Sequence, residues 1–211
     1  LYGSTLSLET WDRCIWEVTF PLLDSLTAEI RHLANATSGE VPAAQPWDES
    51  KVLALNSIGS IFHDFLTSKI MQLDSFPKTW DTFVQYIQDA VLLDNRPISA
   101  PALRCLEKAV KVAPTVNLPP IVSQVLLRVW QIIDVLGGAV IRHSGSQSPV
   151  STTDARFQRP FTQESLVALV DVIQTSRKAS RLVDGREWTL DRMTRLMEIL
   201  KGTLPDLCGV P

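Results

Sequence analysis

Apolar residues recur at spacings of three and four along most of the chain, which predicts amphipathic α-helices rather than strands. The first predicted helix covers residues 8–34, and Pro21 inside it should kink it, because proline removes a backbone donor and crowds the preceding turn. Its predicted buried stripe is Trp11, Ile15, Val18, Leu22, Leu26, Ile30 and Leu33. The second predicted helix covers residues 48–72 and follows a proline-containing loop in which Trp47 lies.

Five more helices are predicted from the same periodicity and from the prolines, glycines and hydroxyl residues that bound it. Their predicted ranges are 77–93, 99–113, 119–143, 162–181 and 189–204. Ser99, Thr162 and Thr189 are the predicted N-caps. The glycine pair at 137–138 is predicted to mark a close helix contact. Residues 144–158 carry few apolar side chains, so they are predicted to form a mobile loop whose deletion leaves the fold intact.

Helices of this length separated by turns predict an all-α, HEAT/armadillo-like helical-repeat solenoid of antiparallel helix pairs, stacked with a right hand. Thr10-Trp11-Asp12 recurs as Thr79-Trp80-Asp81, which is a faint internal repeat. We expect residues 1–211 to be a single segment of a larger protein. Within it, residues 1–113 are expected to form two helix pairs and residues 119–204 the remaining helices. Because stacking leaves long faces free, this architecture favours a role in binding other proteins.

The charge of the chain argues against nucleic acid as a partner. The first 105 residues carry 7 Lys/Arg against 13 Asp/Glu, whereas the remaining residues carry 13 against 10, so the two halves differ in sign. The sequence pI of about 5.6 lies well below the value of about 9 that is typical of nucleic-acid-binding domains. The most apolar stretch, residues 121–141, contains charged side chains, which favours a buried helix over a membrane span.

The chain offers one weak candidate for catalytic chemistry. His63 and Asp64, together with His32 and Asp134, supply the residue types of a helical metal-dependent phosphohydrolase. The helical wheel argues against it, because His63 and Asp64 point away from the apolar face of their helix, whereas metal ligands converge in a supported pocket. No nucleotide-binding glycine pattern and no nucleophile elbow is present. We therefore predict no catalytic residue, no metal and no cofactor.

Cysteine and tryptophan residues are interpreted mainly as structural. Cys14, Cys105 and Cys208 form no CxxC motif, which predicts free thiols in a reducing compartment. Tryptophans that fall on the apolar stripes are predicted to lie in the core; they are Trp11, Trp80 and Trp130. Trp47 is the tryptophan for which we predict an exposed partner contact.

A basic cluster ends the helix predicted at 162–181. Arg177 and Arg181 are four residues apart beside Lys178, and Arg177 continues the line of Ile173 on the apolar stripe. An unpaired charge on a buried stripe is costly, so two interpretations remain open. One is an internal ion pair, for instance to Asp184 or Glu187. The other is an opening to solvent that binds an acidic helix of a partner or anionic lipid headgroups.

Several stretches resemble a known family. Residues 9–24, 51–56 and 76–81 are similar to a repeat downstream of the catalytic domain in large Arf guanine-nucleotide exchange factors. Residues 159–162, 180–188 and 195–202 resemble the related Mon-two (monensin-sensitivity) family of Golgi and endosome trafficking scaffolds. No segment resembles the exchange-factor active-site loop, so no catalytic residue is carried over.

The resemblance implies a scaffold that associates peripherally with the cytosolic face of trans-Golgi network and endosome membranes. It also implies partnership with a Dopey-family protein, and with an Arf-like GTPase or a lipid flippase as further candidates. Two alternatives stay open beside this expectation of a non-catalytic trafficking scaffold. One is a helical enzyme or a GTPase-regulatory module, and the other is a structural spacer that only holds other domains apart.

Overall fold

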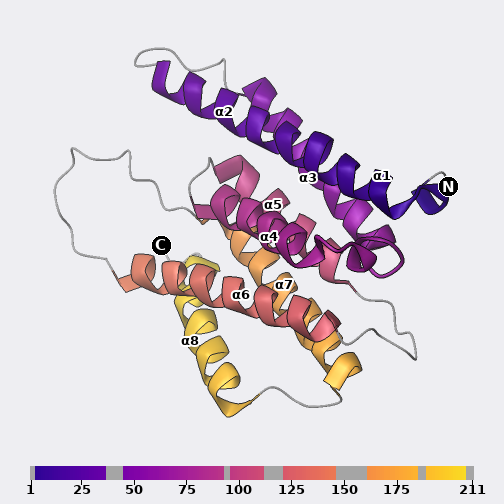
Figure 1. The fold of residues 1–211 in the computed structure, drawn as a ribbon. Helices are drawn as coiled ribbons and strands as arrows, with labels where there is room; N and C mark the ends of the chain where they lie inside the picture. Colours follow the sequence, from indigo (N-terminus) through magenta and orange to yellow (C-terminus); the bar gives the residue numbers. More distant parts are fainter. Residues whose placement is uncertain are drawn as a thin grey trace.

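The computed structural model describes residues 3–36, 45–92, 96–111, 121–145, 161–184 and 189–207 of the 211-residue chain. The predicted all-α class is confirmed, because these described residues form helices that pack against one another and include no strand (Figure 1). The α-helices are α1 (Leu8–Arg13), α2 (Phe20–Ala36), α3 (Gln45–Phe65), α4 (Phe76–Leu92), α5 (Arg96–Val110), α6 (Ile121–Gly145), α7 (Gln163–Asp184) and α8 (Leu190–Leu207). Short 3-10 helices cover Gly3–Thr5 and Ile70–Gln72, and a π-helix covers Cys14–Thr19.

The helices form two layers. Layer one contains α1, α2, α4, α6 and α8, and within it α4 packs on α6 and α6 packs on α8. Layer two contains α3, α5 and α7, and within it α3 packs on α5 and α5 packs on α7. Each helix pair crosses between the layers, because α2 packs on α3, α4 on α5 and α6 on α7. Trp11 at the start of the first helix contacts Phe65 at the end of α3, with ring centroids 4.9 Å apart, so this first pair is antiparallel. The arrangement matches the predicted helical-repeat solenoid.

An aspartate ties each layer-one helix to the next one along the stack. The three ties are Asp12 with Ser75, Asp81 with Arg128 at 2.8 Å, and Asp134 with Arg195 at 2.5 Å. Asp12 and Asp81 each follow a buried tryptophan of the repeated tripeptide, so the two copies occupy equivalent places in the stack. The faint internal repeat in the sequence therefore corresponds to a structural repeat.

The predicted stripe of the first helix is wrong after Ile15. Val18 and Leu22 are 62% and 47% exposed, and the buried line passes instead from Ile15 to Phe20 and Leu23. The cause is the π-helix at Cys14–Thr19, in which the Phe20 amide donates to the Ile15 carbonyl five residues earlier. A π turn holds one residue more than an α turn, so it moves every later residue to a different face. Pro21, which was predicted to distort this helix, follows directly after the π turn.

Two predicted boundaries are also wrong. The second helix was predicted to run to residue 72, but α3 ends at Phe65 and the chain then turns to bury Leu66, Ile70 and Leu73 in the core. Ser99 was predicted to be an N-cap, but α5 begins at Arg96 and Ser99 is buried inside it. The earlier start is possible because the first amides of a helix have no intrahelical partner, so Pro97 loses no hydrogen bond there.

Three other predictions about helix ends and contacts are confirmed. The hydroxyl of Thr162 accepts a hydrogen bond from the Ser165 amide at 3.1 Å, and that of Thr189 accepts from the Arg192 amide at 3.4 Å, as N-caps do. Gly137 faces Ile199 of α8 so closely that an added Cβ atom would lie 2.3 Å from the Ile199 Cδ1 atom. The glycine pair therefore includes a point of close helix packing.

Helix α6 forms the centre of the C-terminal half. Its segment Ile121–Ile141 is long and apolar enough to cross a membrane, with a mean hydropathy of 1.5. In this structure, half of that segment is buried, and α6 packs on α4, α7 and α8. Leu127 and Val135 of this helix are nevertheless exposed. The helix continues to Gly145, so it includes the first two residues of the predicted 144–158 loop, and residues 146–158 lie outside the described part.

Candidate functional site

The basic cluster on α7 lies on the surface. Arg177, Lys178 and Arg181 are all exposed, and none of them forms an ion pair with a residue that the structure describes. The prediction that Arg177 continues the buried stripe is wrong, because the buried line runs from Ile173 to Ser176 and Ala179. These buried residues are spaced by three positions rather than four, so the buried face moves around the helix and Arg177 lies outside it. The side chains of Asp184 and Glu187, the partners named for an internal ion pair, lie outside the described residues.

Trp47 is exposed, as predicted, but it does not lie in a loop. It belongs to the first turn of α3, and 39% of its surface is accessible. Trp11 and Trp80 are buried and Trp130 is partly buried against the core, which confirms their structural role. Trp47 is the exposed tryptophan among those that the structure describes, so it stays the candidate for a partner contact.

The residues of the phosphohydrolase hypothesis are not brought together. His32, His63 and Asp64 are exposed, and Asp134 accepts a hydrogen bond from Arg195 on α8. Within the described ranges, no group of three or more His, Cys, Asp or Glu side chains is placed to hold a metal ion. The hypothesis therefore gains no support from the arrangement of these four residues.

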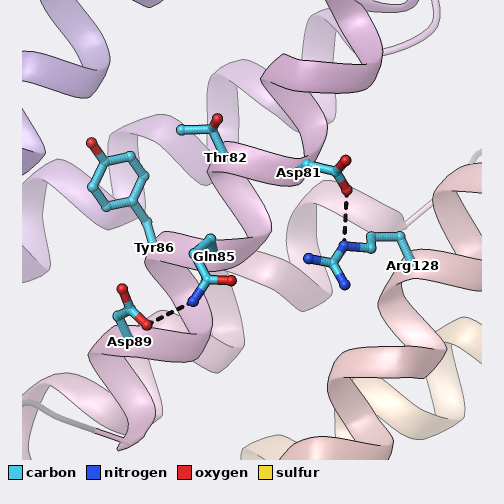
Figure 2. Close-up of a pocket in the computed structure, with 6 residues that line it drawn as sticks. All are labelled: Asp81, Thr82, Gln85, Tyr86, Asp89 and Arg128. Carbon is cyan, nitrogen blue, oxygen red and sulfur yellow. Dashed lines mark hydrogen bonds and ion pairs between the residues drawn. The ribbon is translucent and has the colours of Figure 1, made fainter.

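A recess of about 460 Å³ opens on layer one, between α4 and α6. Figure 2 shows two pairs among its polar side chains: Arg128 donates to Asp81 at 2.8 Å, and Gln85 donates to Asp89 at 2.8 Å. Tyr86, also on its wall, donates to Asp24 of α2 at 2.6 Å. Partial burial, reinforced by this hydrogen bond, raises the pKa of Tyr86 above its usual range. The contacts of Asp81 with Arg128 and of Tyr86 with Asp24 tie α2, α4 and α6 together.

A second concave surface, which we call the seam groove, follows the line where α3 packs on α5 in layer two. It consists of two recesses of about 480 and 410 Å³, and Asn56 lines both. The first recess is lined mainly by Asp48, Glu49, Val52, Leu53 and Pro97. The second is lined by Ser60, Arg104, Cys105, Glu107, Lys108 and Lys111. The basic side chains of this groove were missed at the sequence level, although Arg104, Lys108 and Lys111 follow one another at helical spacings of four and three.

Cys105 forms part of the groove floor. Its thiol is buried, and burial raises its pKa to about 12, so it stays protonated and unreactive at neutral pH. Gly59 of α3 packs directly on it, since an added Cβ atom would lie 3.1 Å from the Cys105 Cα atom. Cys14 and Cys105 are free thiols, as predicted, whereas Cys208 lies outside the described residues.

Comparison with known proteins identifies relatives of the chain. Residues 1–174 match the family model described as the C-terminal region of Mon2 protein. The chain is 27% identical to "Protein MON2 homolog" of Homo sapiens over 180 residues, which cover 72% of this chain and 10% of that protein. It is 30% identical to the Drosophila melanogaster homologue over 117 residues, covering 51% of this chain and 7% of that protein. The matches thus span about a tenth or less of these relatives. No solved structure matches.

Proposed function

The chain belongs to the Mon2 family, since its C-terminal-region model covers residues 1–174, and from this premise we propose that it is a non-catalytic scaffold segment in membrane trafficking. The proposed setting is transport between endosomes and the trans-Golgi network, on the cytosolic face of these membranes. The observation that carries the proposal is the two-layer helical stack, in which polar residues tie neighbouring helices of the same layer. Helical stacks of this kind offer extended surfaces for binding other proteins.

The recess on layer one contributes to the stability of the stack. Its side chains form two pairs, Asp81 with Arg128 and Gln85 with Asp89, and Tyr86 donates to Asp24 of α2. The partner classes that the family resemblance implies are a Dopey-family protein, an Arf-like GTPase and a lipid flippase. We propose Arg177, Lys178, Arg181 and Trp47 as contact residues, because all four are exposed. Arginine and tryptophan are enriched at protein interfaces, and Lys178 adds positive charge beside the two arginines.

The proposal is tested by capture from cytosol with the chain as bait, followed by identification of the bound proteins. Recovery of trafficking proteins supports the scaffold, and a bait that captures nothing specific supports the spacer alternative. Elemental analysis of the purified chain and a nucleotide-exchange assay on small GTPases test the enzyme and GTPase-regulator alternatives. A stoichiometric metal or accelerated exchange would overturn the non-catalytic assignment.

The α7 cluster is tested by the double substitution Arg177→Glu and Arg181→Glu. Both side chains are exposed, so we expect the melting temperature and helicity to stay near wild type while capture of the partner falls. A marked drop in melting temperature would instead assign these arginines a structural role. Unchanged capture by a folded variant would remove the cluster from the proposed interface.

A further inference from the structure

The seam groove has a direction, because α3 and α5 run the same way along it. Its first recess lies near the start of both helices, at Leu53 and Pro97, and its second lies further along both, where Lys108 donates to Ser60 at 2.7 Å. From Pro97 to Lys111 the chain advances about 21 Å, at ~1.5 Å per residue. This length fits six or seven residues of an extended peptide, at ~3.3 Å each, or about four turns of a helix.

The start of the groove is apolar with an acidic rim. Leu53 is 68% exposed, which is high for a leucine, and it lies beside Pro97 and the half-buried Val52. Asp48 and Glu49 lie on the same recess, where Glu49 is exposed and Asp48 is partly buried, with its Oδ1 atom inaccessible to solvent. An exposed leucine beside carboxylates suits a partner side chain that is apolar and has a basic neighbour.

The far end of the groove is basic. Arg104, Lys108 and Lys111 are exposed around the second recess, against one carboxylate, Glu107, among its described lining residues. That carboxylate accepts a hydrogen bond from Thr175 of α7 at 3.2 Å, which directs it toward the neighbouring helix.

The contacts that these basic side chains make within the chain leave their positive charge largely available to a partner. Lys108 donates a hydrogen bond to the Ser60 hydroxyl, which is neutral and does not cancel the charge of the lysine. Arg104 pairs with Glu164, but both side chains are more than half exposed, so a competing carboxylate can replace this partner at little cost.

We propose that the seam groove binds a short charge-polarised segment of a partner protein. Acidic residues of the segment lie over Arg104, Lys108 and Lys111, an apolar side chain packs on Leu53, and a basic residue lies at the acidic rim. The proposal rests on the scaffold function and adds to it a surface and a ligand chemistry. A negatively charged membrane fits less well, because Leu53, the side chain suited to enter a bilayer, lies at the acidic end.

The test uses a fluorescein-labelled peptide with arginines at one end, leucines in the middle and glutamates at the other end, made in both chain directions. A scrambled peptide of the same composition is the reference, and binding is followed by fluorescence anisotropy. We expect saturable binding of one direction of the polarised peptide, tighter than the scrambled peptide, and weaker at high salt. Lys108→Glu with Lys111→Glu should weaken binding of the polarised peptide about tenfold and reduce its preference over the scrambled peptide, while Leu53→Ser should weaken binding through loss of the apolar contact.

The matched control is Arg31→Glu with Lys201→Glu, which makes the same change in net charge on exposed residues of layer one. It should leave the peptide affinity within about twofold of wild type, and circular dichroism should show that all variants are folded. Equal affinity for polarised and scrambled peptides overturns the proposal, as does an equal loss in the control variant. Binding to phosphatidylserine vesicles through Lys108 and Lys111, without binding of the peptide, would assign the groove to a membrane instead.

The outcome also separates this inference from the scaffold function. If the chain captures no cytosolic protein, the scaffold function fails whatever the peptides do. If the wild type and the Lys108→Glu, Lys111→Glu variant capture the same proteins equally well and the peptides do not bind, only the groove assignment fails.

Discussion

Gly137 lies where α6 meets α8, and its replacement by alanine tests how closely the stack is packed there. The added Cβ atom would lie 2.3 Å from the Ile199 Cδ1 atom and 2.4 Å from its Cγ1 atom. Carbon atoms in contact are normally about 3.5–4.0 Å apart, so Ile199, which is fully buried, must move by more than an ångström. Such overpacking costs about 1–3 kcal/mol.

Alanine also favours the helix over glycine by about 1 kcal/mol, which offsets part of this cost. We therefore expect Gly137→Ala to destabilise the fold by about 0–2 kcal/mol, or about 2–4 °C in melting temperature per kcal/mol. In an Ile199→Ala background the obstructing atoms are absent, so the same glycine substitution should stabilise the fold by about 1 kcal/mol. The sign of the effect should thus reverse between the two backgrounds.

The assay is urea unfolding followed by circular dichroism on wild type, the two single variants and the double variant. Ile199→Ala alone should lower the free energy of unfolding by about 2–5 kcal/mol, and a loss of this size would confirm that Ile199 lies in the core. The coupling between the two positions should be about 1–3 kcal/mol. If Gly137→Ala stabilises the wild-type background as much as the Ile199→Ala background, the close approach of α6 and α8 is refuted.

Four further predictions concern the packing of the helices and the burial of Cys105. Gly59→Ala should destabilise the fold by about 0–2 kcal/mol in thermal melts, because its Cβ atom meets the Cys105 backbone, which cannot rotate away, and the helix preference of alanine offsets about 1 kcal/mol of this cost. A stabilisation of about 1 kcal/mol, as at an open helix position, would contradict the contact. Iodoacetamide at pH 8 should modify exposed Cys14 but not Cys105 in the folded chain, as read by peptide mass spectrometry. Since the pKa of Cys105 rises from 9.0 to about 12 on folding, its stabilising contribution is complete below pH 9 and is lost as the pH rises toward 12. Val18→Ser should change stability by less than about 0.5 kcal/mol, whereas a loss of about 2 kcal/mol would place Val18 in the core and refute the π turn.

The first helix illustrates the limit of periodicity as a guide. Trp11 and Ile15 were assigned correctly to the core, because an α-helix repeats its faces every three to four residues. Val18 and Leu22 were assigned wrongly, because one π turn changes the phase and has no clear signature in the residue pattern. In α7 the stripe was predicted correctly as far as Ile173, but Arg177 was then placed on it because small Ser176 and Ala179 carry little apolar signal.

The amino-acid sequence by itself determined the helical class, the order of the helices and the caps at Thr162 and Thr189. These features depend on neighbours within a few residues along the chain, and such neighbours are visible in the sequence. The glycine pair at 137–138 indicated a close helix contact, but only the tertiary structure showed that Ile199 of α8 is the residue in contact. Only the tertiary structure decided where the two layers lie and which faces stay open. The seam groove joins Leu53 of α3 to Lys108 of α5, and each of these residues alone is typical of an ordinary helix surface. It arises because the packing of Gly59 on Cys105 brings two distant helices together, which is a long-range contact that no local pattern encodes.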